Sequence, residues 1–449
     1  MRDFIFYAPT EVAFGADSEA QFVPLLRKYG GTRVLLHYGG QSAERSGLLN
    51  DLRRAMRDAG IPFVELGGVV PNPRLSKVHE GIKLARRQHV DFILAVGGGS
   101  VIDSAKAIGY GVPYDGEVWD VYSGKYTPQT CLPVGVVLTI PAAGSEMSNS
   151  SVITRDEGEL KRGYTNDICR PRFAIMNPRR TFTLPAYQTA AGVTDIMMHT
   201  LERYFCDDGP RELTDAVAEA LLRTMMSVGP RLMQNPEDYN LRAEVMWAGS
   251  LAHNDVTGLR SFGDWATHQI EHELSALYGV THGAGLAAVW DSWASYVMSA
   301  NPARFAQLST NVIGLDTSFP EVTSPAASSP AASSPAASSS PEAISSPDTT
   351  FPGASVTSPA ASSSSCSVAG GLSAGSVESL ALAGIAAMKE FFHSIGMPTS
   401  IPELIGRPAT DEEIALMADK CTRHRTITQG KVKHLTYDDI VVIYKLANK

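Results

Sequence analysis

The chain has 449 residues, of which 44% are hydrophobic, and its formal net charge at pH 7 is -9. This composition is sufficient for two hydrophobic cores, and the negative charge argues against nucleic-acid binding. The five cysteines form no C-x-x-C pair, which argues against a closed structural zinc site, and their odd number argues against a disulfide framework. The reducing cytoplasm is therefore the expected location. The amino terminus contains no long apolar run, so neither a signal peptide nor a membrane span is expected.

Strand-like and helix-like runs alternate over residues 1–185, whereas residues 186–449 are helical with almost no β pattern. This order predicts an α/β, Rossmann-like dinucleotide-binding domain followed by an all-helical domain. Pro185 marks the expected boundary, and ligands commonly bind in the cleft between two such domains.

The first strand, glycine and helix pattern covers residues 32–47 and contains Gly39 and Gly40. NAD-specific sites usually place an acid after this strand, where it binds the ribose 2'-hydroxyl and would repel a 2'-phosphate. No acid follows the strand here, and Ser42 and Arg45 lie close by. The sequence therefore favours NADP(H) over NAD(H).

A second pattern of this kind begins with the apolar run 91–96, which meets Gly97, Gly98 and Gly99 before a helical segment. Glycines let the backbone approach a phosphate closely, and the helix start offers free N–H groups to bind it. Ser100 and Asp103 form an S-x-x-D capping pattern. The G-x-G-x-x-G fingerprint is missing, so a turn that binds nothing is the alternative.

A third strand-like run, residues 132–140, ends in a small polar turn that contains Thr139, Gly144 and Ser145. Ligands collect at the carboxyl ends of strands in α/β sheets, so this turn is a candidate part of the same site.

Four residues further along the chain make a complete ligand set for a divalent metal ion: Asp195, His199, His268 and His282. Asp195 and His199 stand four apart in a helical stretch, so they share one face. His268 and His272 are also four apart, and their spacing alone does not say which of the two binds the metal. Imidazole with carboxylate suits Fe(II) or Zn(II), and an open coordination position is expected; ordinary core or surface histidines are the alternative.

Residues 316–375 contain near-repeats of Ser, Pro and Ala between two helical segments. This composition offers too little apolar surface to offset backbone ordering, so a disordered insertion is expected there.

With these motifs together, the chain resembles the iron-containing (group III) alcohol dehydrogenases, in particular their butanol dehydrogenase-like, NADPH-using aldehyde reductase branch. The resemblance runs through FYAPTEVAFG, YGGQS, VGGGSVIDSAKAI, TIPAAGSEMS, AAGVTDIMMHTLERYF, FGDWATHQIEHELSALYGVTHG and MKEFFHSIGMPT. It implies the fold shared with dehydroquinate synthase, a homodimer, and hydride transfer between NAD(P)H and a butanal-like aldehyde or its primary alcohol.

The resemblance also implies roles for individual residues. It assigns the metal ligand to His268 and leaves His272 near the substrate as a possible proton relay. It gives the pyrophosphate to the loop from Gly97 to Ser100 with Asp103. It places Thr139, Ser145 and Lys161 at the cofactor, with Lys161 at a ribose.

Two positions depart from the branch: Gln41 stands where a third glycine is usual, and Ala143 stands where threonine is usual. Gln41 could crowd a 2'-phosphate or form a hydrogen bond to it. Phe262 and Trp265 are candidates for the substrate pocket. Two other hypotheses are a lyase of the dehydroquinate synthase type and a non-catalytic interaction protein that uses the Ser/Pro tract.

Overall fold

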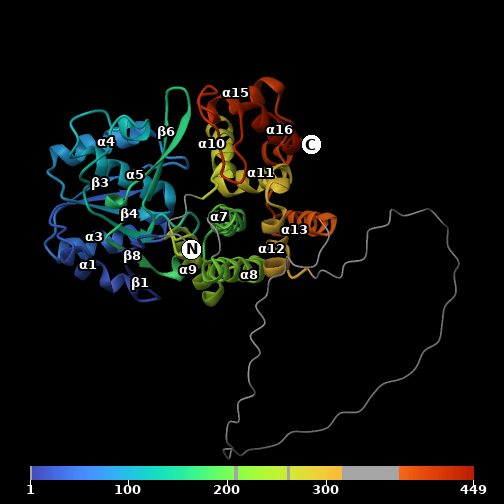
Figure 1. The fold of residues 1–449 in the computed structure, drawn as a ribbon. Coiled ribbons are helices and arrows are strands. Elements are labelled where there is room, and N and C mark those ends of the chain that lie inside the picture. Colours follow the sequence, from blue (N-terminus) through green and yellow to red (C-terminus); the bar gives the residue numbers. More distant parts are fainter. Residues whose placement is uncertain (1–2, 207–210, 260–262, 316–373) are drawn as a thin grey trace, which may run out of the picture.

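The computed structural model describes residues 3–206, 211–259, 263–315 and 374–449 (Figure 1). A parallel sheet with its helices forms the N-terminal part, on the left of Figure 1, and a helical part follows on the right. This confirms the predicted fold class. No helix in the described ranges is both long and apolar enough to cross a membrane.

The six-stranded sheet has the order β1-β8-β5-β4-β2-β3, and every neighbouring pair is parallel. Its strands are β1 (Glu11–Phe14), β2 (Val34–Tyr38), β3 (Phe63–Leu66), β4 (Phe92–Gly97), β5 (Val134–Leu138) and β8 (Phe173–Met176). Parallel strands require crossover connections, and helices make most of them here; between β5 and β8 the chain instead forms two further strands, at Ser150–Arg155 and Leu160–Thr165, and a 3-10 turn. The helices of this part are α1 (Phe22–Lys28), α2 (Ser42–Arg45), α3 (Leu48–Asp58), α4 (Leu75–Arg87), α5 (Gly99–Gly111) and α6 (Trp119–Tyr122), with short 3-10 turns at Ser18–Gln21, Asp167–Cys169 and Pro178–Thr181.

Side chains of the central strands alternate between two hydrophobic cores, one on each face of the sheet. In β4, Phe92 and Leu94 join the core under α1 and α3, whereas Ile93 and Ala95 join the core under α4 and α5. Every residue of β4 and β5 is buried, as expected for strands covered on both faces.

The carboxyl ends of β2, β4 and β5 bring the three predicted loops to one edge of the sheet. The strand, glycine and helix pattern at β4 and α5 is confirmed, with Gly98 as the residue before the helix. The backbone N–H of Thr139 donates to the carbonyl of Gly97 at 3.0 Å, which joins the second and third loops.

An antiparallel hairpin, β6 (Ser150–Arg155) and β7 (Leu160–Thr165), extends from the N-terminal part toward the helical part (Figure 1). Its β7 strand packs on α10 (Ala266–Tyr278). Arg162 Nη1 lies 2.9 Å from Glu273 Oε1 of that helix, so an ion pair fastens the hairpin to the helical part.

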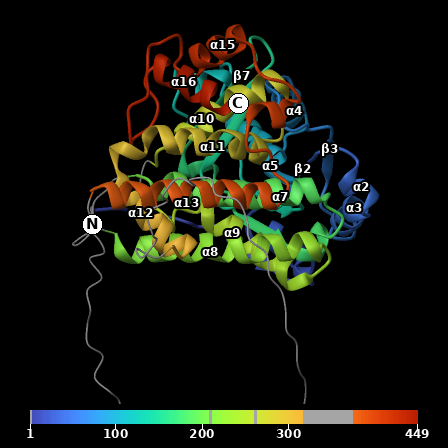
Figure 2. The same ribbon diagram turned by 90° about the vertical axis from the view of Figure 1, so that its right-hand side faces the viewer.

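The helical part has a third core, and α7 (Ala186–Tyr204) lies at its centre, against α8, α9 and α11. Figure 2 shows α13 alongside α11. The other helices are α8 (Glu212–Gln234), α9 (Tyr239–His253), α11 (His282–Val297), α12 (Pro302–Leu308), α13 (Ala374–Ser394), α14 (Ile401–Ile405), α15 (Asp411–Cys421) and α16 (Tyr437–Ala447), with a 3-10 turn at Met298–Ala300 and a π turn at Ser309–Ile313.

The sheet's last strand ends at Met176 and α7 begins at Ala186, so the predicted boundary at Pro185 falls in the connection between them. The insertion predicted at 316–375 lies outside the described residues, apart from Ala374 and Gly375, with which α13 begins.

Candidate metal and cofactor site

One cavity of about 1070 Å³ lies between the loops of the sheet and the helices α7, α9, α10 and α11. The residues assigned from the sequence to the metal, to the cofactor or to the proton relay line it, whereas Gly144 of the third loop does not. Those that line it are Gly39, Gly40, Ser42, Gly97, Gly98, Gly99, Ser100, Asp103, Thr139, Ser145, Lys161, Asp195, His199, His268, His272 and His282.

Asp195, His268 and His282 bring their ligand atoms to within 4.8 Å of one another. Oδ1 of Asp195 lies 4.0 Å from Nε2 of His268 and 3.8 Å from Nε2 of His282. The three side chains come from α7, from α10 and from the first residue of α11. The chain reverses at Gly279, whose left-handed backbone (φ 68°) ends α10 and allows α11 to begin at His282.

His199 lies beside this set, with its ring between those of His253 and His268, at centroid distances of 4.1 and 4.7 Å. Its Nδ1 donates to the backbone carbonyl of Asp195 at 2.9 Å and lies 3.2 Å from Oδ1 of the same residue. Nε2 is therefore the nitrogen left for a metal, although His199 is not among the mutually close ligand atoms.

Two buried carboxylates fix the other imidazoles. Nδ1 of His268 lies 2.8 Å from Glu202 Oε1, and Nδ1 of His282 is hydrogen-bonded to Glu271. In both rings the Nδ1 proton is donated, so Nε2 keeps its lone pair and faces Asp195. Lys161 Nζ lies 3.4 Å from Glu271 Oε2, so one buried cation faces the second carboxylate.

The charges of these groups are set by burial and by one another. Burial opposes ionisation of Asp195, but the surrounding imidazoles hold the pKa of its carboxyl group below the ordinary value. Burial lowers the pKa of His268 and of His272, so both rings are neutral at pH 7. Burial also raises the pKa of Glu202 to about 7. A buried anion beside neutral imidazoles is a favourable arrangement for a divalent cation.

A strained turn places Trp265 against the candidate metal cluster of Asp195, His268 and His282. Its backbone is left-handed (φ 60°), a conformation that costs a bulky residue about 1–3 kcal/mol. Asp264 holds the turn, because its Oδ2 accepts from the backbone N–H groups of Lys431 and Val432 and its own N–H donates to the carbonyl of Glu202. The indole then lines the cavity, 5.1 Å from the His268 ring between centroids.

The capping pattern predicted at Ser100 and Asp103 is wrong, because α5 begins after Gly98 with no side-chain cap. Asp103 instead accepts from Ser145 Oγ at 2.6 Å and from the backbone N–H of Val152 at 2.9 Å. The carboxylate oxygens of Asp103 are thus bonded to the third loop and to the hairpin, and these tertiary contacts replace the local cap. Both partners are distant in the sequence, so local spacing did not reveal them.

A buried lysine of α5 completes this anchor. Lys106 Nζ lies 2.8 to 3.2 Å from five oxygens, the hydroxyl and carbonyl oxygens of Ser145 and Ser148 and the carbonyl oxygen of Ser150, among which its three N–H groups donate. The loop between β5 and β6 is therefore rigidly attached to the helix that follows the second glycine loop.

The other positions that the sequence singles out differ in their exposure and in whether they line the cavity. Lys161 contacts Glu271 and lies 3.5 Å from Nδ1 of His282, so it lies beside the candidate metal ligands. Ala143 lines the cavity, whereas Gln41 and Arg45 are exposed and do not line it. Phe262 lies outside the described residues.

Three residues of the site were not predicted: Glu202, Glu271 and His253. Glu202 stands seven residues after Asp195 and three after His199, so helical spacing alone could have placed it on their face of α7. Glu271 likewise stands three after His268. His253 has no such signal, because it comes from α9, which carries no other predicted site residue.

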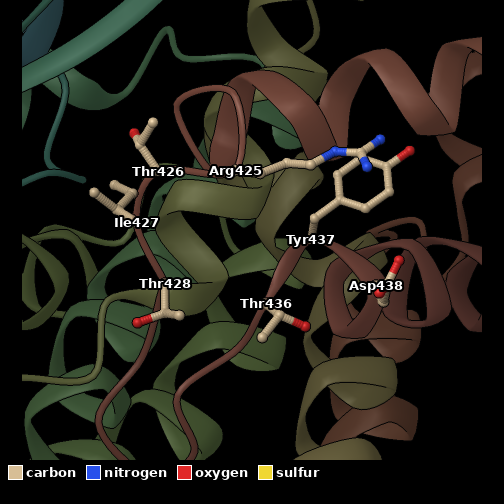
Figure 3. A pocket seen from close by; sticks show the side chains of 7 residues that line it. All are labelled: Arg425, Thr426, Ile427, Thr428, Thr436, Tyr437 and Asp438. Atoms are coloured by element: carbon tan, nitrogen blue, oxygen red, sulfur yellow. The ribbon is translucent and has the colours of Figure 1, made fainter.

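A second hollow, of about 630 Å³, lies between residues 425–428 and the start of α16 (Figure 3). The Arg425 guanidinium stacks on the Tyr437 ring, 3.9 Å from its centroid. None of the predicted residues lines this hollow, and it contains no histidine. The cavity that is lined by Asp195, His268 and His282 is therefore the candidate site.

Comparison with known proteins gives consistent matches. Residues 9–178 match the family model for iron-containing alcohol dehydrogenase, and residues 189–329 match the model for the C-terminal part of the same family. The chain is 34% identical over 447 residues to NADH-dependent butanol dehydrogenase A of Clostridium acetobutylicum, covering 99% of both chains. It is 37% identical over 292 residues to an NADPH-dependent aldehyde reductase of Escherichia coli, covering 64% of this chain and 74% of the relative.

Among solved structures, the crystal structure of NADH-dependent butanol dehydrogenase A from Thermotoga maritima aligns with a TM-score of 0.84 at 33% identity. The alignment covers 100% of this chain and 99% of that one.

Proposed function

The chain belongs to the iron-containing alcohol dehydrogenase family, and from this membership we propose that its cavity interconverts butanal-like aldehydes and their primary alcohols. The activity is that of an alcohol dehydrogenase or aldehyde reductase that uses a nicotinamide cofactor. The lyase and interaction-protein hypotheses are set aside, because the relatives are dehydrogenases and reductases.

The observation that carries the proposal is a pair of buried atoms without hydrogen bonds. Oδ1 of Asp195 and Nε2 of His268 have no hydrogen-bond partner among the described residues, although both are buried and only 4.0 Å apart. An unsatisfied buried polar atom costs about 1–3 kcal/mol, and a cation between the two atoms would satisfy both. We assign the metal to Asp195, His199, His268 and His282, with Fe(II) or Zn(II) as the ion.

When bound at these residues, the ion would supply Lewis-acid activation of an aldehyde oxygen, and a reduced nicotinamide would supply the hydride. The protein's own groups orient these partners. Glu202 and Glu271 keep the Nε2 atoms of two imidazoles directed at one point, and Trp265 covers one side of it. The proton for the product alcohol is assigned to His272, which lines the cavity and whose Nδ1 has no hydrogen-bond partner among the described residues.

The cofactor is assigned to the sheet side of the cavity, with its pyrophosphate at Gly97, Gly98, Gly99 and Ser100. NADP(H) is favoured over NAD(H), because no carboxylate is among the residues that line the cavity around Gly39, Gly40 and Ser42. The relatives include both NADH-dependent and NADPH-dependent enzymes, so the preference must be tested with both cofactors.

A homodimer in the cytoplasm is also part of the proposal. Phe4, Ile5, Phe6 and Tyr7 are 44 to 73% exposed in one run next to β1, the edge strand of the sheet. Such a run together with an unpaired strand edge favours burial against a second copy. Light scattering of the purified protein would give the mass of a dimer, and a monomer would contradict this part.

The first experiment measures oxidation of NADPH and of NADH by the purified protein with butanal. The protein is stripped of metal with a chelator and reloaded anaerobically with Fe(II) or Zn(II). Metal-dependent oxidation, with higher kcat/KM for NADPH, is expected. Equal turnover in the stripped protein, or no turnover with either ion, would contradict the metal assignment, and a higher kcat/KM for NADH would contradict the cofactor preference.

A further inference from the structure

His253 lies where the cofactor side of the cavity meets the metal side. It is the last residue of α9, it is partly buried, and it lines the cavity. Its Nδ1 lies 2.6 Å from the backbone carbonyl of Ala143, in the loop after β5. Its ring lies 4.1 Å from the ring of His199 between centroids, with 35° between the planes. One side chain thus contacts both the loop and a candidate metal ligand.

The loop after β5 contacts the helical part closely at two glycines, Gly144 and Gly192. Gly144 has φ 60°, and a Cβ built there would lie 2.3 Å from the carbonyl oxygen of Gly249 and 2.7 Å from Cβ of His253. A Cβ on Gly192 of α7 would lie 2.6 Å from the carbonyl oxygen of Pro141. A shift of this loop must therefore move α7 and α9 or be resisted by them.

The same loop belongs to the cofactor side. Thr139, Ala142, Ala143 and Ser145 all line the cavity, and Thr139 is hydrogen-bonded to Gly97 of the second glycine loop. A nicotinamide cofactor bound along these loops would hold the loop after β5 in one position.

Through its two contacts, the His253 imidazole links the position of this loop to the orientation of the His199 ring. Ala143 offers a carbonyl, so Nδ1 of His253 carries the proton and the ring plane is fixed by this bond. The carboxylate nearest to Nδ1 of His199 is that of Asp195, 3.2 Å away, which is itself a candidate metal ligand, whereas Glu202 and Glu271 hold the rings of His268 and His282. The His199 ring is also held by its own backbone bond and by neighbouring rings. A change at Ala143 therefore reaches His199 through the one ring, His253, that contacts both residues.

We propose that His253 is a positioning residue that couples cofactor binding to metal binding, so that each ligand raises the affinity for the other. The inference rests on the proposed function, because it needs both ligands in this cavity. Coupling of binding free energies is reciprocal, so the two affinities must change by the same factor, typically about 5–150-fold.

The test measures four dissociation constants on the full chain. Zn(II) is titrated in competition with a chelator, with and without NADPH, and NADPH is titrated by its fluorescence, with and without Zn(II). We expect at least a fivefold effect in both directions, with equal factors. A factor near one in the wild-type protein would overturn the inference without needing any variant.

Two variants separate the contacts of His253. His253→Phe keeps a ring against His199 and removes the bond to Ala143, whereas His253→Asn keeps a donor near Ala143 and removes the ring. Both should still bind Zn(II) and NADPH singly, but their coupling factor should fall at least fivefold. His79→Phe and His79→Asn, at an exposed position on α4, are the matched controls and should keep the wild-type factor.

The outcomes are distinguishable from failure of the proposed function. Butanal reduction together with unchanged coupling in both His253 variants would overturn the role of His253 and leave the dehydrogenase intact. Reciprocal coupling that is lost in the variants would support the role of His253 even if butanal were not turned over.

Discussion

Oδ1 of Asp195 and Nε2 of His268 lie 4.0 Å apart in the buried part of the cavity, and neither atom forms a hydrogen bond within the described structure. Protein interiors seldom contain two such acceptors without a binding partner, because each acceptor loses its hydration on burial and gains no hydrogen bond that would offset the loss. The arrangement explains why Asp195 is an aspartate and why Nδ1 of His268 is occupied by Glu202.

Asp195→Asn is expected to abolish metal retention while leaving the fold intact, because the amide keeps the shape of the side chain and removes its charge. Loss of an outer partner already costs about 10–100-fold in metal affinity, so loss of a ligand should exceed that. His282→Ala should behave alike. Metal content after gel filtration, measured by mass spectrometry, and circular dichroism check this, and a wild-type metal content in either variant would refute the ligand assignment.

Glu202→Gln is expected to weaken metal binding about 10–100-fold, because Glu202 fixes Nδ1 of His268 as the donor. The amide can donate instead, which would allow the wrong nitrogen to carry the proton. Chelator competition with Zn(II) measures the change. Glu219→Gln is the control, since this buried carboxylate accepts from Tyr204 and Gln307 in a separate contact. Equal losses in both variants would point to a general effect of burying an amide.

The grouping of the candidate metal ligands was predictable because helical spacing is a local property. Asp195 and His199 share a face of α7 wherever that helix lies in the fold. The glycine after Tyr278 is a recognisable end for α10 before His282. Glu202 could have been read from the same helix. The fold class was equally accessible, because apolar runs followed by glycine and a helical pattern are typical of parallel α/β units.

Contacts between distant segments could not be read from the sequence. Asp103 binds Ser145 and Val152, so its apparent cap was a false local signal. The position of the hairpin depends on Arg162 and Glu273, which are 111 residues apart. His253 meets Ala143 across 110 residues, and no spacing rule predicts a meeting of that kind.

Gly144→Ala is expected to lower both the melting temperature and the affinity for NADPH. A left-handed backbone costs a residue with a Cβ about 1–2 kcal/mol, and the added carbon would overlap the carbonyl oxygen of Gly249. The loop must then move away from α9, which should weaken NADPH binding about tenfold or more if the overlap costs at least 1.4 kcal/mol at the cofactor. Fluorescence titration and thermal denaturation measure both effects.

Gly375→Ala is the matched control for that variant. A Cβ at Gly375 meets nothing within 4 Å, and the residue lies in the first turn of α13, where alanine is the better helix former. It should leave NADPH affinity unchanged. If Gly144→Ala were as harmless as Gly375→Ala, the close contact between the loop and α9 would be contradicted.

His37 should make the protein more sensitive to acid. It is fully buried in β2, with Nδ1 2.9 Å from the carbonyl of Leu66 and Nε2 2.9 Å from the hydroxyl of Ser104. Burial lowers the pKa of its imidazole to about 4, against about 6.5 in the unfolded chain. Between pH 6.5 and 4 the unfolded state therefore binds a proton that the folded state refuses. Stability is lost as the pH falls through this window, by up to about 3 kcal/mol.

His37→Asn keeps a donor for Leu66 and removes the titrating group, so the drop in melting temperature from pH 7 to pH 5 should be smaller than in the wild-type protein. The difference between the two proteins isolates His37, because the other histidines titrate in both. At pH 5 it corresponds to about 2 kcal/mol of the free energy of unfolding. His434→Asn, at an exposed histidine, should keep the wild-type pH dependence. An equal drop in the His37→Asn and wild-type proteins would mean that the buried imidazole accepts a proton without loss of stability. That result would contradict the lowered pKa of His37.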